Sequence, residues 1–261
     1  MPGQIRHAIE DSIAVLTIDQ PAKHNAMSLA MWQAIPALVA TAVADPAVSA
    51  LVLRGAGAKA FCAGADISRF GEERTGASAA ALYDEAVEQA ETALAQAAKP
   101  TVALVNGLCF GGGLGLAMTC DLRLCSDAAR FRLPAARLGI GYGLAGVARL
   151  TRRLGFAAVA EILFTARIFD AAEAKGLGLV SRIFPAARFA QDCAAYLAII
   201  AENAPLSLMA AKSALVELEK PESARNRAAV AAAVAACYES ADYAEGRLAF
   251  AQKRQPVFQG R

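Results

Sequence analysis

The segment NGLCFGGGLGLAMTCDLRL, residues 106–124, follows the apolar run TVALV at residues 101–105 and carries a glycine-rich loop into an apolar helix. The same order occurs earlier, where ALVLR at residues 50–54 precedes GAGAKAFCAGAD at residues 55–66. Glycine and alanine allow a ligand to approach the backbone closely. The first N–H groups of a helix have no partner within the helix and can bind a polar or anionic group. Each segment therefore predicts a strand, a ligand-accessible loop and a helix.

Outward from these segments, strands alternate with helices. Residues 13–19 (IAVLTID) and 122–126 are further predicted strands, and residues 179–184 are a short one. Helices are predicted from the Ser28 cap to about residue 44 and over residues 77–98. Several strands are apolar on both faces, which is typical of a parallel sheet covered by helices on both sides. The fold class is α/β.

The strand signal fades after residue 130, and residues 131–146 are predicted to be a loop. Asp170 is predicted to cap a short helix. The pattern is then helical over residues 188–204, 205–220 and 222–252. We therefore expect two units: an α/β core over residues 1–200 and a C-terminal helical oligomerisation module over residues 201–261.

Composition excludes several classes of protein. The 261 residues are 56% hydrophobic and 19% charged with a net charge of +2, which is unlike a disordered chain. No run of Lys or Arg indicates a nucleic-acid partner. The polar N-terminus and the short apolar runs predict no signal peptide and no membrane association, hence a cytoplasmic protein. The six cysteines form no CxxC pair, so no metal site is expected.

The sequence lacks the common motifs for nucleotide binding and for nucleophilic catalysis. GxGxxG beginning at Gly111 would need glycine where Leu116 stands, and GxxxxGK[ST] does not occur. The only histidines, His7 and His24, lie in no known catalytic-triad motif. The two glycine-rich loops remain the candidate site.

The residues resemble the crotonase superfamily, the enoyl-CoA hydratase/isomerase family. KAFCAGADI at residues 59–67 and residues 106–124 look like its two signature segments, and PAKHNAMS at residues 21–28 looks like its first CoA loop. Residues 161–180, EILFTARIFDAAEAKGLGLV, and the ending LAFAQKRQPVFQGR also resemble the family. The resemblance implies parallel sheets flanked by helices in a ββα spiral and an acyl-CoA substrate.

The resemblance also implies roles for individual residues. The N–H groups of Ala65 and Gly112 would form an oxyanion hole that stabilises a thioester enolate. Ala63, Ala65 and Ile67 would line the path of the CoA, and Lys23 and Lys253 could meet its phosphates. The remaining candidate substrate-binding residues are Ala26, Asp66, Gly111, Pro134 and Arg137. For Asp66 a helix cap, and for Arg137 a salt bridge, are open alternatives to substrate binding.

The sequence departs from the family at its acid–base positions. One glutamate of the hydratases would lie three residues after Gly112, where this chain has Gly115. The second would follow Pro134, where this chain has Ala135, and a third acidic position used by some relatives corresponds to Gly143. Neither glycine nor alanine can move a proton, and each lost group is worth roughly 10²–10⁴ in rate. Ordinary hydratase activity is therefore doubtful.

Tyr142 is the remaining candidate catalytic side chain, since methylmalonyl-CoA decarboxylase-like members have a tyrosine at the corresponding place. That branch tends to have a histidine where this chain has Ala65. Three functions stay open: a hydratase/isomerase-like enzyme, a decarboxylase of a malonyl-CoA-like substrate, and a non-catalytic acyl-CoA binder. No cofactor is expected beyond the coenzyme A of the substrate. A homotrimer or homohexamer is expected, because such assemblies are usual for the resemblance and the C-terminal helices are rich in Ala and Leu.

Overall fold

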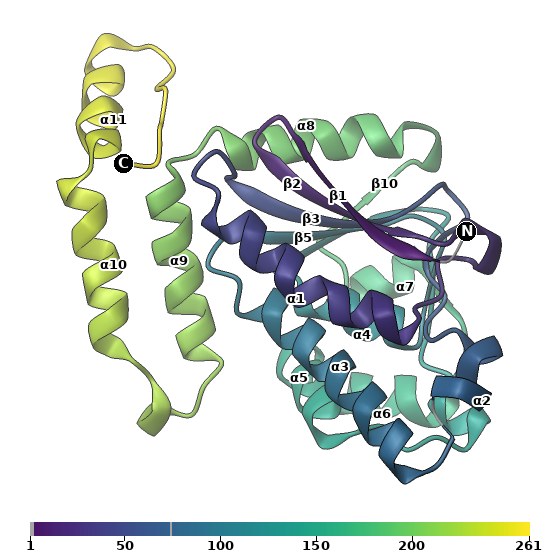
Figure 1. The fold of residues 1–261 in the computed structure, drawn as a ribbon. Helices are drawn as coiled ribbons and strands as arrows, with labels where there is room; N and C mark the ends of the chain where they lie inside the picture. The colour runs from purple at the N-terminus through teal and green to yellow at the C-terminus, as the bar shows by residue number, and fades with distance from the viewer. Residues whose placement is uncertain (1–2, 74) are drawn as a thin grey trace.

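The computed structural model describes residues 3–73 and 75–261. Two sheets form the centre of the core, and helices cover them (Figure 1). The six-stranded sheet has the order β1-β2-β3-β5-β7-β10, and all its neighbours are parallel except β1 and β2. Its strands are β1 (Gln4–Glu10), β2 (Ile13–Asp19), β3 (Ala50–Gly55), β5 (Thr101–Val105), β7 (Leu122–Ser126) and β10 (Arg182–Phe184).

A four-stranded sheet, in the order β4-β6-β8-β9, runs beside the first. Its strands are β4 (Ala60–Cys62), β6 (Leu108–Phe110), β8 (Arg130–Arg132) and β9 (Phe169–Asp170). In chain order β3 leads to β4, β5 leads to β6, and β7 leads to β8, so each turn of the chain adds one strand to each sheet. The expected α/β fold and its ββα spiral are confirmed.

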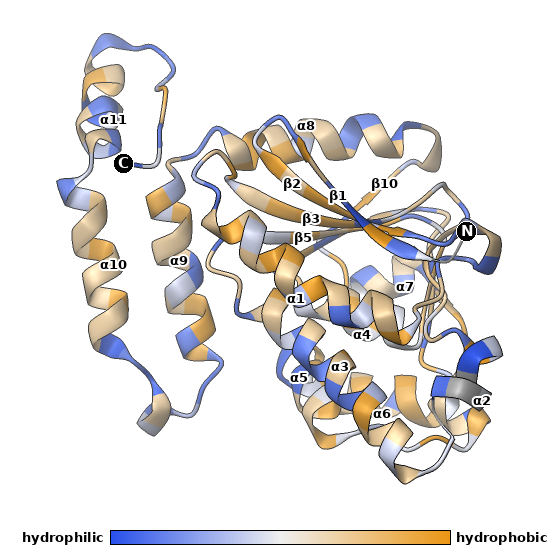
Figure 2. Ribbon diagram, in the orientation of Figure 1, coloured by the Kyte–Doolittle hydropathy of each residue, from blue (hydrophilic) through white to orange (hydrophobic). Residues whose placement is uncertain are grey.

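The helices cover the sheets in two groups. On one face lie α1 (Leu29–Ala44), α2 (Phe70–Glu73), α3 (Ala77–Ala95), α4 (Gly112–Thr119), α5 (Leu144–Leu154), α6 (Phe156–Thr165) and α7 (Ala171–Gly176). On the other face α8 (Phe189–Ala201) packs three buried side chains, Phe189, Cys193 and Leu197, against the outer side of the large sheet. Figure 2 shows that the central strands are largely apolar, which is why helices cover both faces of the sheet.

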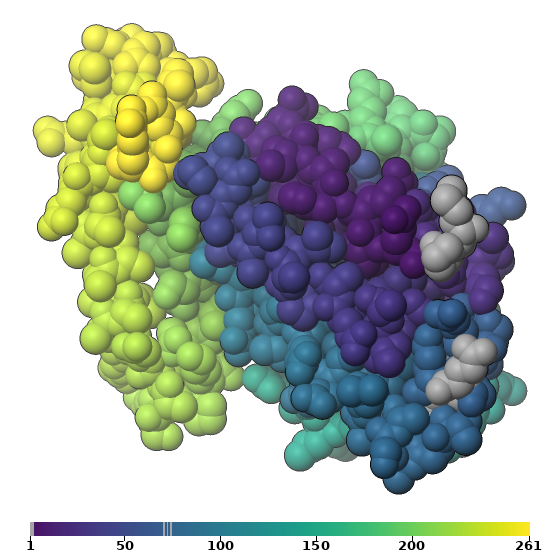
Figure 3. All heavy atoms as spheres, viewed as in Figure 1, coloured from purple at the N-terminus to yellow at the C-terminus, as the bar shows by residue number. Residues whose placement is uncertain are grey.

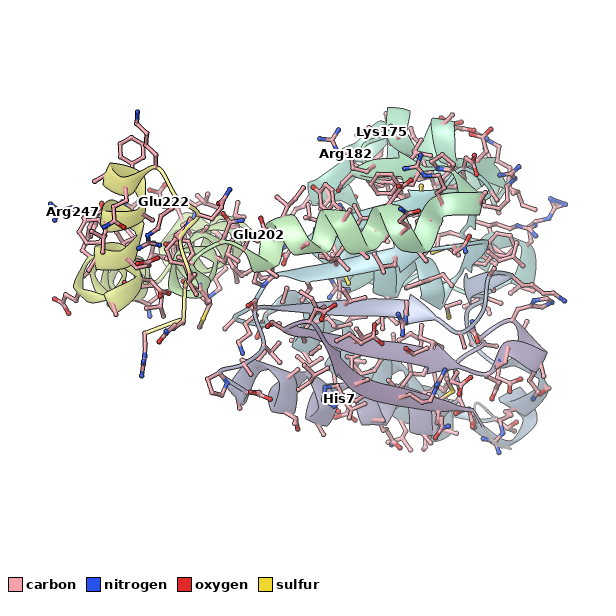
Figure 4. All side chains as sticks on the ribbon, turned by 90° about the horizontal axis from the view of Figure 1, so that it is seen from above. His7, Lys175, Arg182, Glu202, Glu222 and Arg247 are labelled. Carbon is pink, nitrogen blue, oxygen red and sulfur yellow. The ribbon has the colours of Figure 1, made fainter. Side chains whose placement is uncertain are left out.

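The C-terminal helices lie to one side of this core (Figures 1 and 3). They are α9 (Pro205–Leu218), α10 (Arg227–Glu239) and α11 (Ala241–Gln252). Figure 4 shows the same separation from above, with Glu202 near the junction and Glu222 and Arg247 out on the module. Within the described residues no single helix is both long and apolar enough to cross a bilayer; only a pair bent by 96°, residues 186–201 and 205–218, meets that test, and by length and composition alone.

Most sequence-based elements are confirmed within a few residues, and the differences have local causes. β1 was not predicted because it is an edge strand exposed on one side, so its residues are largely polar. The helix expected over residues 222–252 is two helices, since the Ser240 side chain accepts a hydrogen bond from the Tyr243 N–H and starts a new one. The loop expected over residues 131–146 contains β8, a 3-10 turn and the start of α5.

Candidate active site

The two glycine-rich loops meet backbone to backbone. A Cβ atom added to Gly64 would lie 3.1 Å from the Phe110 carbonyl oxygen and 3.5 Å from the Gly112 nitrogen. Gly111, with φ of +52°, bends the chain so that α4 starts beside the first loop. A Cβ on Gly113 would lie only 2.4 Å from the carbonyl oxygen of Cys62. These glycines are therefore required by close approach as well as by conformation.

Two backbone donors face the space between these loops. The Met27 N–H donates to Gly64 O at 2.7 Å and the Asp66 N–H to Met27 O at 2.9 Å, so the N–H of Ala65, between them, points the other way. Gly112 is the first residue of α4, and its N–H has no partner within the helix. Within the described residues neither N–H donates a hydrogen bond to another protein atom.

A cavity of about 320 Å³ opens at these donors. Its floor includes both loops and the indole of Trp32, which donates from Nε1 to the Tyr83 hydroxyl at 2.8 Å. One wall is α3, the other is the segment from Leu133 to Gly146 that leads into α5. The sequence-derived candidates that line the cavity are Ala63, Ala65, Ile67, Gly111, Gly112, Pro134 and Tyr142.

Glu91 on α3 is a buried carboxylate at this cavity, and the sequence analysis did not identify it. It is 8% exposed, and its Oε2 accepts a hydrogen bond from Nη1 of Arg149 on α5. Burial raises the pKa of Glu91; the charge and hydrogen bond of Arg149 oppose this, and Glu88 adds to it. A signal was present in the sequence, because Glu91 lies one turn after Val87 on the side of α3 that faces the core.

Glu91 and Tyr142 converge on Gly115. A Cβ at Gly115 would lie 2.7 Å from Glu91 Oε1 and 3.2 Å from the Tyr142 hydroxyl. The tyrosine ring is held against α5, where a Cβ on Gly146 would lie 2.6 Å from its Cε1. Burial, and then the charge of Glu91, raises the pKa of Tyr142 far above its usual range, so its hydroxyl stays protonated. The space that a side chain at Gly115 would need is filled from two other elements.

Lys23 and Asp66 form an ion pair outside the cavity. Lys23 Nζ donates to Asp66 Oδ2 at 2.7 Å and to Ser68 Oγ at 2.6 Å, while the Ser68 N–H donates to Asp66 Oδ1 at 3.2 Å. Burial would raise the pKa of Asp66, but hydrogen bonds from Lys23, Ser68 and Gln20 outweigh it and hold the pKa below its usual range. Asp66 thus organises the turn after Ala65, and Lys23 remains half-exposed.

Three other candidates do not lie in the cavity. Ala26 is buried beneath the first loop, and Arg137 is exposed on the 3-10 turn after Pro134. Lys253 ends α11, on the C-terminal module and far from α2 and α3 (Figure 1). Within one chain Lys253 does not line this cavity.

A second hollow of about 570 Å³ lies across the large sheet, between β1 to β3 and α8. Arg54 is held by two of the residues that line this hollow: its Nη2 lies 2.8 Å from Glu10 Oε1, and its Nε donates to Thr17 Oγ1 at 3.2 Å. The hollow touches the two glycine-rich segments only at their first residues, Gly55 to Gly57 and Asn106, and neither Ala65 nor Gly112 lines it. In the described part of the chain no group of three or more His, Cys, Asp or Glu side chains is placed to hold a metal ion.

Comparison with known proteins gives one family and many relatives. Residues 8–261 match the family described as Enoyl-CoA hydratase/isomerase. The chain is 32% identical over 248 residues to the short-chain-enoyl-CoA hydratase of Clostridium acetobutylicum, with 94% of each protein covered. It is 37% identical over 221 residues to the carnitinyl-CoA dehydratase of Proteus mirabilis, covering 83% of this chain and 84% of that one.

Solved structures show the same arrangement of elements. The enoyl-CoA hydratase/carnithine racemase of Magnetospirillum magneticum superposes with a TM-score of 0.91 at 35% identity, over 98% of this chain and 96% of that one. An enoyl-CoA hydratase/isomerase family protein of Hyphomonas neptunium gives a TM-score of 0.92 at 35% identity, over 98% of each chain.

Proposed function

Because this chain belongs to the enoyl-CoA hydratase/isomerase family, the crotonase superfamily, we propose that it binds acyl-CoA thioesters and stabilises a thioester enolate through the N–H groups of Ala65 and Gly112. One observation carries the proposal: two unpaired backbone donors, one of them at the start of α4, face a cavity of about 320 Å³. Preorganised donors and a helix dipole stabilise developing negative charge on a carbonyl oxygen.

The reaction is distinct from ordinary hydration. Hydration of an enoyl-CoA places water between two carboxylates, and the corresponding positions here are Gly115 and Ala135. The backbone alone supports stabilisation of an enolate, and a side chain is needed to move the proton at the α-carbon. The proposal needs no cofactor beyond the coenzyme A carried by the substrate.

The lining of the cavity bears on the acyl group. Asp84, Glu88 and Glu91 all line it from α3, and no arginine or lysine does so among the described residues. None of the described lining residues is therefore a cation that would bind the second carboxylate of a dicarboxylic acyl group. This argues against the alternative of a decarboxylase for a malonyl-CoA-like substrate, although Tyr142 is placed to donate a proton.

A matched pair of ligands tests the oxyanion hole directly. Butyryl-CoA has the thioester carbonyl, and S-butyl-CoA is the thioether that lacks it. We expect calorimetry to show butyryl-CoA binding more tightly by about tenfold, since each net hydrogen bond contributes about 0.5–1.5 kcal/mol. Equal affinities would refute the proposed oxyanion hole. If neither ligand binds, the proposed CoA site is refuted as well.

The reaction itself is found by incubating the protein with saturated, unsaturated and malonyl-type CoA thioesters and weighing the products. If methylmalonyl-CoA loses carbon dioxide, then Tyr142→Phe decides the role of its hydroxyl. Turnover should fall by one to several powers of ten with unchanged affinity if that hydroxyl donates the proton. Binding without any product would instead support the alternative of a non-catalytic acyl-CoA binder.

A further inference from the structure

We propose that Glu91 is the acid–base residue of this site: its carboxylate removes and returns a proton at the α-carbon of the bound thioester. This inference rests on the proposed function, because the thioester must lie against the donors of Ala65 and Gly112. Glu91 comes from α3, an element different from the two that carry Gly115 and Ala135.

The two oxygens of Glu91 are in different situations. Arg149 binds Oε2, and Oε1 is the atom that lies 2.7 Å from the place of a Cβ at Gly115. Among the described residues Oε1 receives no hydrogen bond, and Glu91 lines the cavity. Arg149 therefore fixes the carboxylate in position and leaves one oxygen free toward the ligand.

The glycine at position 115 is what makes room for this carboxylate. Any larger residue there would place its Cβ inside the contact distance of Oε1. The same absence of a side chain lets the Tyr142 hydroxyl approach the point from the other wall. A glutamate at position 115 and the observed position of Glu91 therefore exclude each other in this packing of α3, α4 and α5.

The electrostatics suit proton transfer to carbon. Facing Glu91 are Arg149 from α5, Glu88 from its own helix and the Tyr142 hydroxyl from the segment before α5. Burial and the neighbouring Glu88 favour the protonated acid, whereas Arg149 favours the carboxylate. A carboxyl group whose pKa is raised toward neutrality is a stronger base than an exposed one.

The step balances without a further reactant. The α C–H bond breaks and an O–H bond forms on Glu91, while the electron pair moves into the enolate and the oxygen charge is held by Ala65 N–H and Gly112 N–H. In the reverse direction Glu91 returns the proton. In deuterium oxide the acid exchanges with solvent, so the α-carbon gains deuterium while the thioester is otherwise unchanged.

This exchange is the test, and it does not require the physiological substrate. Butyryl-CoA is incubated with the protein in deuterium oxide, and mass spectrometry follows the α-hydrogens. We expect exchange in the wild type and a loss of at least a hundredfold in Glu91→Gln, with affinity for butyryl-CoA within about twofold. Glu85→Gln is the control, since Glu85 is exposed on the same helix and lies outside the cavity lining; it should exchange like the wild type.

Glu91→Asp guards against a folding artefact, because it keeps the charge beside Arg149 and withdraws the carboxylate by about one bond. Exchange by Glu91→Asp should fall roughly a hundredfold. Its melting temperature is compared with that of Glu85→Gln, which should equal the wild-type value. If Glu91→Asp and Glu91→Gln exchange at the wild-type rate, or if the wild type binds butyryl-CoA without exchange, Glu91 is not the base. If butyryl-CoA does not bind the wild type, the proposed function itself fails.

Arg149 is a positioning residue, and its role can be recognised from the pH dependence of the exchange. It stabilises the carboxylate form of Glu91, so Arg149→Met should move the rise of exchange with pH to higher pH. A purely structural role of Arg149 would lower the rate at every pH without moving the profile.

Discussion

The core and the C-terminal module differ in how many of their helical residues are buried. In the core α4 buries every residue from Gly113 to Thr119 against the loops and sheets. In the module α10 buries none of its residues, and Phe250 of α11 is 87% exposed. The interior of the core is packed within one chain, whereas the module is mostly surface; apolar side chains that this chain does not cover lie on the module and also at Leu144, Phe156 and Phe164 of the core. The cavity described above is lined by residues of one chain, and the exposed apolar side chains of the module are suited to contact another copy.

Glycine substitutions should separate the two regions most strongly. Gly113→Ala places a Cβ 2.4 Å from Cys62 O, and overpacking of this kind costs about 3 kcal/mol of unfolding free energy or more. Gly246→Ala in α11 meets only the Phe258 ring at 3.5 Å and should stabilise by about 0.5–1 kcal/mol through helix propensity. Denaturant unfolding of both variants checks this; a tolerated Gly113→Ala would contradict the close packing of β4 and α4.

Assembly tests whether the module surface is covered by a second copy. We expect trimers or dimers of trimers for the wild type and smaller species for the double variant Tyr238→Glu with Phe250→Glu, whose side chains are 64% and 87% exposed in one chain. Ala251→Glu, also exposed on α11, is the control that should assemble normally. Light scattering distinguishes these outcomes, and a monomeric wild type at micromolar concentration would refute the expectation.

Restoring the absent glutamate sharpens the comparison within the core. Gly115→Glu alone puts its Cβ against Glu91 Oε1 and adds a second buried carboxylate, so we expect a loss of about 1–3 kcal/mol and no hydratase activity. Combining it with Glu91→Ala and Ala135→Glu makes room and should raise crotonyl-CoA hydration above that of the wild type, which we expect to be slow. Fast hydration by the wild type would show that a carboxylate pair is not needed here.

The smallest effect concerns pH, and the two regions should respond in opposite directions. Glu245 in the module pairs with Arg254 and accepts from the Val257 N–H, which lower its pKa from 4.5 to about 2; its contribution is present above pH 4.5 and is lost as the pH falls through about 2. Glu91 has a raised pKa, so its contribution decreases as the pH rises above the usual value of 4.5.

Melting temperatures across pH 2–7, with Glu245→Gln and Glu91→Gln compared to the wild type, measure these slopes. The melting temperature of the wild type should exceed that of Glu245→Gln by less as the pH falls. It should exceed that of Glu91→Gln by less as the pH rises toward neutral. Parallel curves for the two variants would show that neither carboxylate is perturbed as described.

Much of the core was predictable because its signals are local. The apolar strands of residues 13–19 and 101–105 lie where their composition indicates, and Asp170 caps α7 by accepting from the Glu173 N–H at 2.9 Å. Edge strand β1 was missed because it is largely polar, and the strands of the second sheet were missed because two or three residues are too few to show a periodicity. The positions without acidic residues, Gly115 and Ala135, were evident from the spacing alone.

The sequence by itself determined the strand–loop–helix units, the glycines at which the loops approach one another, and the absence of carboxylates at Gly115, Ala135 and Gly143. Only the tertiary structure decided what occupies the space left at Gly115, because Glu91 and Tyr142 reach it from separate elements across the packing of α3, α4 and α5. It also placed Lys253 at the end of α11, outside the lining of the cavity. Local patterns describe elements, whereas the meeting of side chains depends on how those elements pack.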